Sequence, residues 1–240
     1  MADSYEQRVN REIAIWKKKL FAKPGKMERI SKNAQNFISA KMPKKINQAF
    51  SYSIKTMVEG VLNGSSYVPK AQQSYHTLAE MDEAAEGTFT AYRKTAVVEG
   101  AGTGFGGGFI AMADFPLLLS IKVNYLYALS RIYGYNPKDL SERVFILLVF
   151  QLAFSSPEKR KELLPVILNW EQSKERFSEI DWNSFQQEYR DTIDLVKMFQ
   201  LIPGFGAAVG AYANRQLLDQ LGETAKNAFR IRVMQEGGAH

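Results

Sequence analysis

The sequence has no cysteine, and its two histidines are His76 and His240. The lack of cysteine excludes disulfide bonds, thiolate metal sites and a cysteine nucleophile, and it is typical of proteins in a reducing cytoplasm. Because the histidines are 164 positions apart, a histidine-rich metal site is excluded, and a serine–histidine triad would depend on His76. No GxxxxGK[ST] phosphate loop and no acidic cluster occurs. We therefore predict neither a metal nor a cofactor.

The alternation of apolar and polar residues that marks a β-strand is also missing. Apolar residues recur instead every three or four positions, which predicts helices. The clearest stripes are Val9, Ile13, Trp16 and Leu20, then Ile46, Phe50, Ile54, Met57 and Val61, and finally Leu217, Leu221, Ala225 and Ala228. Further helices are expected over residues 27–38, 78–99, 114–133, 141–154, 157–170 and 185–196. The predicted fold class is all-α, a compact multi-helix domain.

Acidic residues are scarce at the start of the chain. The net charge is +6, and residues 1–60 contain 13 lysines and arginines against 5 acidic residues, whereas the rest contains 18 against 20. Such asymmetry favours a polyanionic partner, although a basic surface that faces only water would also account for it. We assign residues 1–62 to basic amphipathic helices packed on a helical core of residues 63–240, within one structural domain. The first residues, MADSYEQRVNREIAIWKK, lack the apolar core of a signal peptide, so a cytoplasmic protein is expected.

The segment GAGTGFGGGFIAMADFP, residues 100–116, permits two interpretations. Gly102, Gly104 and Gly107 have the GxGxxG spacing of a dinucleotide-binding loop. That loop requires a preceding strand in a βαβ unit and an acidic residue about 20 positions further on, and none of these accompanies the motif. A nucleotide cofactor is therefore disfavoured.

The second interpretation is close packing between helices. Small residues four positions apart leave a smooth groove along a helix, so that two backbones can approach closely. This spacing occurs twice, at Gly100, Gly104 and Gly108, and at Gly206 and Gly210. We therefore predict two glycine-rich helices packed on one another in the core.

The same segments raise the alternative of membrane insertion. Residues 100–121 contain Asp114 as their one charged residue, and residues 198–214 contain none. Crossing a membrane takes about 20 apolar residues, and a carboxylate in the bilayer is costly. Because the first segment carries that carboxylate and many glycines, and the second is short, a buried hairpin is favoured over insertion.

Three blocks of sequence resemble the EcsC protein family. They are GAGTGFGGGFIAMADFPLLLS, ALSRIYGYNP, and IPGFGAAVGAYANRQLLDQLGETAKNAFRIR, which together span roughly residues 80–235. The resemblance implies a bacterial, cytoplasmic, all-helical protein that works at the membrane face, linked to an ABC transporter through neighbouring genes. It implies no established catalytic residues.

Polar residues within the glycine-rich segments are the candidate catalytic or ligand-binding residues. Asp114 ends the first run and Glu99 precedes it. A buried carboxylate can act as a general base with a raised pKa, but an aspartate before a Phe-Pro pair is more often a helix N-cap. Asn214 and Arg215 hold a comparable place in the second run, where we expect ligand-binding or structural polar core residues.

Three functions remain open from the sequence. The first is a non-enzymatic accessory protein on an anionic membrane surface or a membrane protein, with contacts from Arg8, Arg11, Trp16, Lys17, Lys18 and Lys19. The second is a small-ligand-binding protein or hydrolytic enzyme with a pocket near Asp114 and Asn214. Nucleic-acid binding ranks third and is not expected, because no recognition helix or aromatic stacking motif accompanies the basic residues.

Overall fold

The computed structural model describes residues 4–22, 44–64, 74–103, 108–177 and 207–237, and their side chains except at 44–47, 50, 96–103, 108–115 and 207–214. Within these ranges the chain is helical and contains no β-strand, which confirms the all-α fold class. The helices are α1 (Tyr5–Leu20), α3 (Lys44–Leu62), α4 (Leu78–Thr103), α5 (Gly108–Ile132), α6 (Leu140–Phe154), α7 (Pro157–Leu168), α8 (Trp170–Ser173), a 3-10 turn (Lys174–Phe177) and α11 (Ala207–Gly237).

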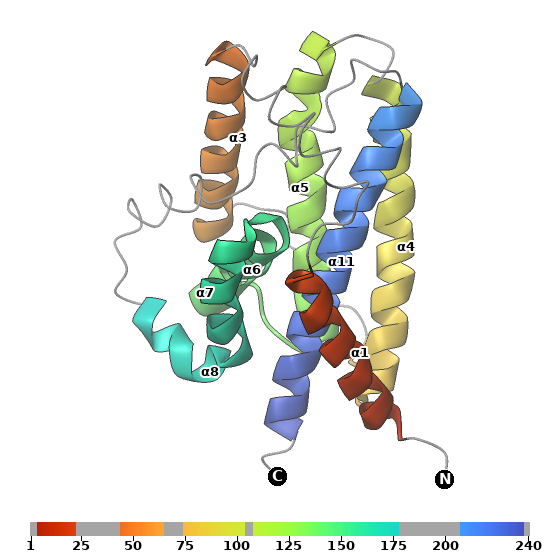
Figure 1. Ribbon diagram of the computed structural model, residues 1–240, viewed down its shortest axis with the longest axis vertical. Helices are drawn as coiled ribbons and strands as arrows, with labels where there is room; N and C mark the ends of the chain where they lie inside the picture. Colours follow the sequence, from red (N-terminus) through yellow and green to blue (C-terminus); the bar gives the residue numbers. More distant parts are fainter. Residues whose placement is uncertain (1–3, 23–43, 65–73, 104–107, 178–206, 238–240) are drawn as a thin grey trace.

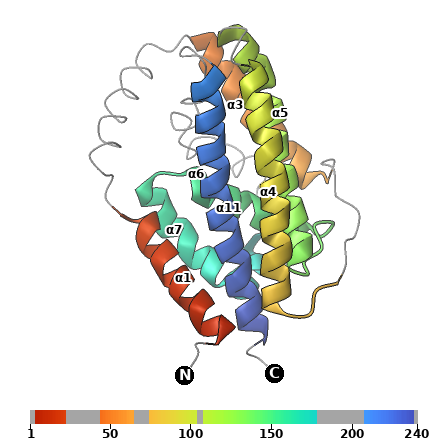
Figure 2. The same cartoon turned by 90° about the vertical axis from the view of Figure 1, so that its right-hand side faces the viewer.

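Three long helices, α4, α5 and α11, run along the long axis of the molecule (Figure 1). α11 packs most extensively on α4 and also contacts α5, α6 and α1. α3 lies against α5, and the short helices α6, α7 and α8 form a layer beside the lower half of α11. Figure 2 shows α11 between α1 on one side and α4 on the other. Residues of α11 therefore reach several neighbouring helices.

The first helix forms where its sequence favours it. Ser4 is its N-cap and accepts a hydrogen bond from the backbone N–H of Gln7, whose side chain accepts one from the backbone N–H of Ser4. Such a capping box satisfies two of the N–H groups that a helix start leaves unpaired. The predicted stripe of Val9, Ile13, Trp16 and Leu20 is buried. α1 thus rests on the body of the protein along one face and leaves the other face to solvent.

The helix α6, predicted from the sequence over residues 141–154, lies at the centre of the core. Every residue from Val144 to Phe154 is buried, because neighbouring helices cover the helix on all sides. The next helix begins at Pro157, where Ser156 caps it by accepting a hydrogen bond from the backbone N–H of Lys159. The predicted seam of α11 is also confirmed, since Leu217, Leu221, Ala225 and Ala228 are all buried.

The glycine-rich run differs from the prediction of one continuous helical face. α4 ends at Thr103 and α5 begins at Gly108, so Gly100 and Gly108 belong to two different helices. Gly210 lies in α11, which packs on both of them. The helices that carry these glycines are therefore neighbours. Close contact at the glycines stays a prediction, because Gly104 and Gly206 lie outside the described residues.

The interpretation of Asp114 as a helix N-cap is wrong. α5 begins at Gly108 and continues through Asp114 and Pro116 without a break. An N-cap precedes the first helical residue, and Asp114 lies in the helix interior.

None of the helices in the described ranges is both long enough and apolar enough to cross a membrane.

Candidate functional site

Two arginines near the end of α11 are buried and contact different helices. Arg230 is 4% exposed and Arg232 is 2% exposed. Because residues two positions apart face different sides of a helix, the first reaches α1 and α4 and the second reaches α6 and α8. A buried charge must be paired to be tolerated. The partners of these arginines therefore show which helices they hold together.

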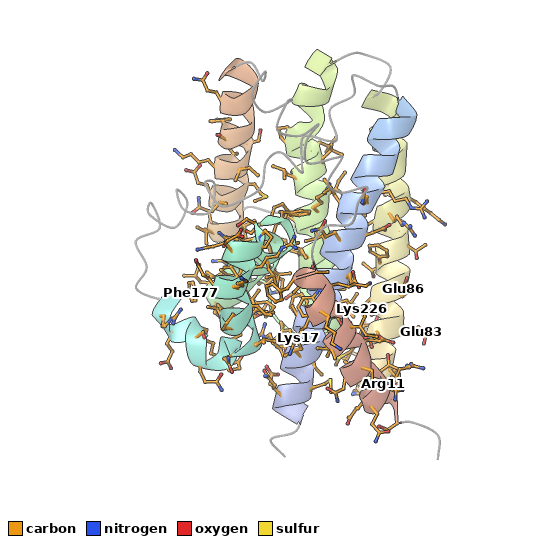
Figure 3. All side chains as sticks on the ribbon, in the orientation of Figure 1. Arg11, Lys17, Glu83, Glu86, Phe177 and Lys226 are labelled. Carbon is orange, nitrogen blue, oxygen red and sulfur yellow. The ribbon has the colours of Figure 1, made fainter. Side chains whose placement is uncertain are left out.

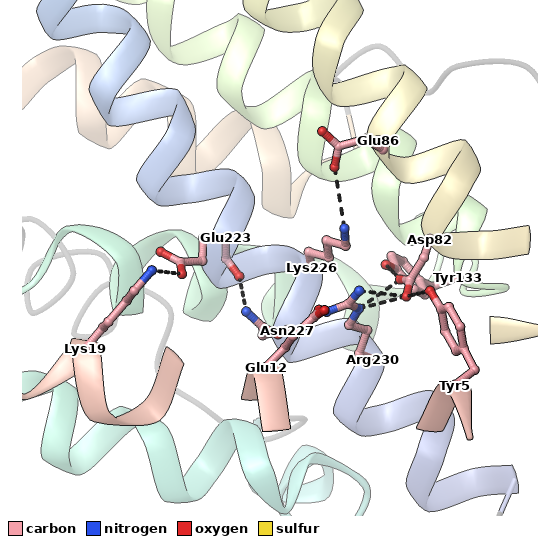
Figure 4. A network of polar contacts seen from close by, with 10 residues as sticks. All are labelled: Tyr5, Glu12, Lys19, Asp82, Glu86, Tyr133, Glu223, Lys226, Asn227 and Arg230. Carbon is pink, nitrogen blue, oxygen red and sulfur yellow. Dashed lines mark hydrogen bonds and ion pairs between the residues drawn. The ribbon is translucent and has the colours of Figure 1, made fainter. Parts of the chain in front are cut away.

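Arg230 forms a network with the buried carboxylate of Asp82 in α4 (Figure 4). Its Nε lies 2.9 Å from both carboxylate oxygens, and its Nη1 donates to Glu12 Oε2 of α1 at 2.7 Å. The Tyr133 hydroxyl donates to Asp82 Oδ1 at 2.5 Å, and the Tyr5 hydroxyl donates to Oδ2. One carboxylate thus links the first helix, α4, the C-terminal end of α5 and α11.

This network keeps Asp82 ionised. Burial alone would raise the pKa of Asp82, but hydrogen bonds from Arg230, Tyr133 and Tyr5 stabilise the carboxylate more, so its pKa is lowered. The pKa of Tyr133 is raised, first by burial and then by the adjacent negative charge of Asp82. A general base needs a pKa near the working pH and access to substrate. Asp82 has neither, so we interpret it as a structural residue. We call its network with Arg230, which connects the surrounding helices, the latch.

Above this latch lies a groove of about 530 Å³ between α1, α4 and α11, which we call the charged groove. Its described lining residues form ion pairs with one another: Lys19–Glu223 at 2.7 Å, Arg93–Asp219 at 3.1 Å, Lys226–Glu86 at 3.5 Å and Arg230–Glu12 at 2.7 Å. Figure 3 shows Lys226 on α11 beside Glu86 on α4. The groove is lined by Glu12, Ile15, Lys19, Ala85, Glu86, Phe89, Arg93, Tyr125, Asp219, Gly222, Glu223, Lys226, Asn227 and Arg230. It combines charges of both signs with an aromatic base.

The aromatic base depends on Gly222 of α11. A Cβ atom at Gly222 would lie 2.5 Å from Cε2 and 2.9 Å from Cδ2 of the Phe89 ring. That ring packs edge-on against Tyr125, with 5.8 Å between the ring centroids. The missing side chain therefore lets Phe89 of α4 lie directly on the backbone of α11.

We expect Gly222→Ala to destabilise the protein by about 1–3 kcal/mol, because Phe89 must move to admit the methyl group. Gly87→Ala on α4 is the matched control, since a Cβ there meets nothing within 4 Å. Because alanine has a better helix propensity than glycine, Gly87→Ala should stabilise the protein by up to about 1 kcal/mol. Urea denaturation followed by circular dichroism measures both changes. Equal stability of the two variants would contradict the close approach at Gly222.

A second groove, of about 460 Å³, lies between α3 and α5. Among the side chains that the structure describes, its lining carries no charge and consists of Tyr52, Ser53, Thr56, Met57, Gly60, Pro116, Leu119, Ser120, Val123 and Asn124. The hydroxyls of Ser53 and Ser120 donate to carbonyl oxygens of their own helices.

The outer face of α1 is basic and carries an exposed apolar side chain. We define the outer face of α1 as Arg8, Arg11, Ile15 and Lys18, which are exposed on the side of the helix away from its buried stripe. Ile15 is 55% exposed and lies at the edge of this face, where it also lines the charged groove. Arg11 lies one turn before Ile15 and Lys18 almost one turn after it. Phe21, just past the helix end, is partly exposed as well.

Among the described residues, no three His, Asp or Glu side chains are placed to hold a metal ion.

The sequence pattern of the EcsC protein family matches residues 7–234. The chain belongs to the EcsC protein family. This EcsC-family protein is 50% identical over 231 residues to Protein EcsC of Bacillus subtilis strain 168, covering 96% of this chain and 97% of that protein. It is 36% identical over 163 residues to uncharacterized protein YdbA of the same strain, covering 66% of this chain and 60% of that protein. No solved structure matches the chain.

The family resemblance found in the sequence is thus confirmed, and the match extends over the basic N-terminal helix as well. The predicted site residues fare differently. The backbones of Glu99, Asp114 and Asn214 lie in α4, α5 and α11, and their side chains lie outside the described part of the structure. Whether Asp114 and Asn214 share a pocket stays a prediction.

Two of the sequence predictions place a side chain wrongly. Trp16 is 2% exposed and belongs to the core, so it is not available for contact with a membrane surface. Arg215 is exposed and lies 3.9 Å from Asp219 on the next turn of α11, so it is not part of a polar core. In contrast, Arg8, Arg11, Lys18 and Lys19 are exposed as expected, and Lys17 is half-buried.

The residues of the buried networks were not predicted from the sequence. Arg232 continues the seam of α11, since it follows Ala228 by four positions and Ala225 by seven. A charged residue at a seam position predicts a buried ion pair, and this signal was present for Arg232. No comparable signal marks Asp82, which lies in LAEMDEAAE among acidic residues that face solvent.

Proposed function

We propose that this EcsC-family protein is a peripheral membrane accessory protein that docks on an anionic membrane surface through the outer face of α1. The observation that carries the proposal is the exposed Ile15 between Arg11 and Lys18. An amphipathic helix binds an interface by inserting apolar side chains while its basic residues contact anionic headgroups. Each basic residue close to the surface adds about 1 kcal/mol.

The position of α1 supports this assignment. The helix rests on α11 and leaves its opposite side uncovered in the described structure, at the edge of the molecule (Figure 2). Glu12 is turned toward Arg230, which removes an acidic charge from the basic face. The membrane in question would be the inner face of the cytoplasmic membrane. An ABC transporter, which the family resemblance implies, is the membrane protein we propose as a neighbour.

The proposal predicts salt-sensitive binding to anionic vesicles. We expect the protein to sediment with vesicles that contain phosphatidylglycerol, and we expect binding to fall as salt rises, because screening weakens contacts with the surface charge. An Arg11→Glu, Lys18→Glu double variant should bind at least about thirtyfold more weakly, since two favourable contacts of about 1 kcal/mol each are lost.

A Lys94→Glu, Lys138→Glu double variant is the matched control. Both lysines are exposed, Lys94 belongs to α4 and Lys138 to the connection between α5 and α6, and the net charge changes by the same amount. Equal loss of binding in the two double variants would show that only net charge matters, and the outer face of α1 would not be the docking surface. Binding that resists high salt would contradict electrostatic docking.

Small-ligand binding is the second candidate function, and the charged groove is the observation that favours it. A hydrolytic activity receives less support. Asp82, a buried carboxylate near the groove, has a lowered pKa because its oxygens accept hydrogen bonds from neighbouring side chains.

A further inference from the structure

We propose that the charged groove binds a small zwitterion that carries a phosphate group and a primary ammonium group, such as phosphoethanolamine. The inference starts from the balance of charge. Among the described residues, the lining contains four acidic residues, Glu12, Glu86, Asp219 and Glu223, and four basic residues, Lys19, Arg93, Lys226 and Arg230. A ligand of one sign would meet repulsion as well as attraction there, whereas a zwitterion can pair with both kinds of side chain.

The size and build of the groove also suit a small ligand. Its volume of about 530 Å³ falls within the range of roughly 300–1,000 Å³ that small-molecule sites occupy. Its walls come from separate helices held together by the Asp82–Arg230 latch beneath them. Phe89 and Tyr125 give it an apolar base against which the carbon atoms of a ligand can pack.

Asn227 is the second, independent observation. It lines the groove and is 5% exposed. Its Nδ2 donates to the backbone oxygen of Glu223 at 2.8 Å, which fixes the orientation of the amide. Its Oδ1 is buried and has no hydrogen-bond partner within the part of the chain that the structure describes. A buried acceptor without a donor is unfavourable. The atom is closed off from solvent, so the ammonium group of a ligand reaches it only once the Lys226–Glu86 pair has opened.

The Lys226–Glu86 pair is the part of the groove that can open for a ligand. Its atoms are 3.5 Å apart, longer than the roughly 2.7–2.9 Å of a charge-assisted hydrogen bond. A phosphate can take the place of Glu86 next to Lys226, and its other oxygens can contact a further cation of the rim. The ammonium group then donates to the freed Glu86 carboxylate and to Asn227 Oδ1.

The test is calorimetric titration of the full chain with phosphoethanolamine. We expect saturable binding, and weaker binding of phosphocholine by about tenfold or more, because a quaternary ammonium has no N–H to donate. Glu86→Gln and Lys226→Met should each weaken binding of phosphoethanolamine by about tenfold or more, whereas Glu83→Gln should leave it within about twofold. Glu83 is the matched control, since it is exposed on the same helix and does not line the groove.

Stability of the variants is checked by thermal denaturation, and little change is expected because the Lys226–Glu86 pair is partly exposed and long. Absence of saturable binding would overturn the proposal. Equal affinity for phosphocholine would remove the ammonium from it, and unchanged binding by Glu86→Gln and Lys226→Met would place the ligand elsewhere.

A second arm distinguishes a soluble ligand from a lipid headgroup. Vesicles of phosphatidylethanolamine and of phosphatidylcholine are compared in the absence of anionic lipid. Binding to the first that Glu86→Gln abolishes identifies the headgroup as the source, and binding of soluble phosphoethanolamine alone identifies a soluble metabolite. The Arg11→Glu, Lys18→Glu variant should keep its affinity for soluble phosphoethanolamine, so failure of membrane docking and failure of this site are separate results.

Discussion

An Asp82→Asn variant is expected to lose about 3 kcal/mol of its free energy of unfolding, because it leaves the buried guanidinium of Arg230 without its buried counter-charge. The substitution keeps the shape of the side chain and removes its charge. Arg230 Nη2 lies 2.8 Å from Asp82 Oδ2, and both side chains are almost fully buried. Glu12, the other carboxylate on Arg230, is partly exposed and cannot replace the lost partner fully. Urea denaturation followed by circular dichroism measures the change.

The control for this variant is Asp219→Asn, which removes a carboxylate from the partly exposed ion pair with Arg93. An exposed pair contributes about 1 kcal/mol or less, so this variant should remain close to the unaltered protein. If Asp82→Asn were as stable as Asp219→Asn, the network would not hold α1, α4, α5 and α11 together.

The pH dependence of this difference follows from the lowered pKa of Asp82. A carboxyl group whose pKa is lower in the folded state contributes stability above its unfolded pKa, and loses it as the pH falls through the folded value. The unfolded pKa of aspartate is about 3.9. The stability gap between the unaltered protein and Asp82→Asn should therefore be constant from about pH 5 to 8 and should shrink below about pH 4. A gap that persists at lower pH would indicate that the loss comes from hydrogen bonding and not from charge.

The fold class could be predicted because apolar periodicity depends on local sequence. The stripe of Val9, Ile13, Trp16 and Leu20 repeats at helical spacing, and the structure buries all four residues. The same reasoning placed Trp16 on a membrane-facing surface, although its own position in that stripe assigns it to the core. Periodicity shows which face of a helix is apolar, and it leaves open whether protein or lipid covers that face.

The candidate site could not be predicted because its residues meet only in three dimensions. Glu12, Glu86 and Lys226 come from three helices, and each looks like an ordinary solvated charge in its own segment. Gly222 likewise stands alone in the sequence, without the four-residue spacing that drew attention to Gly100 and Gly206. Its importance depends on Phe89, which lies 133 positions earlier in the chain.

Arg232→Lys is expected to cost about 3 kcal/mol of stability, even though the positive charge is retained. The Arg232 guanidinium donates to both oxygens of Glu142, at 2.7 and 2.8 Å, and to Glu171 Oε1 at 3.0 Å. Its Cζ atom also lies 3.7 Å from the centroid of the Tyr135 ring. A lysine ammonium cannot form the two parallel hydrogen bonds, and it does not stack on a ring as a planar guanidinium does. One Glu142 oxygen would then be buried without a donor.

Arg215→Lys is the control, because Arg215 is exposed and pairs with Asp219 at 3.9 Å, so its change should stay within about 0.5 kcal/mol. A double variant tests whether the charged pair stabilises the protein more than apolar side chains of similar size would. Replacing both Arg232 and Glu142 by methionine removes both charges and keeps apolar volume, and such exchanges are often neutral or stabilising. We expect this double variant to be more stable than Arg232→Lys in urea denaturation. The opposite order would mean that the pair itself stabilises the junction of α11, α6 and α8 beyond what apolar packing provides.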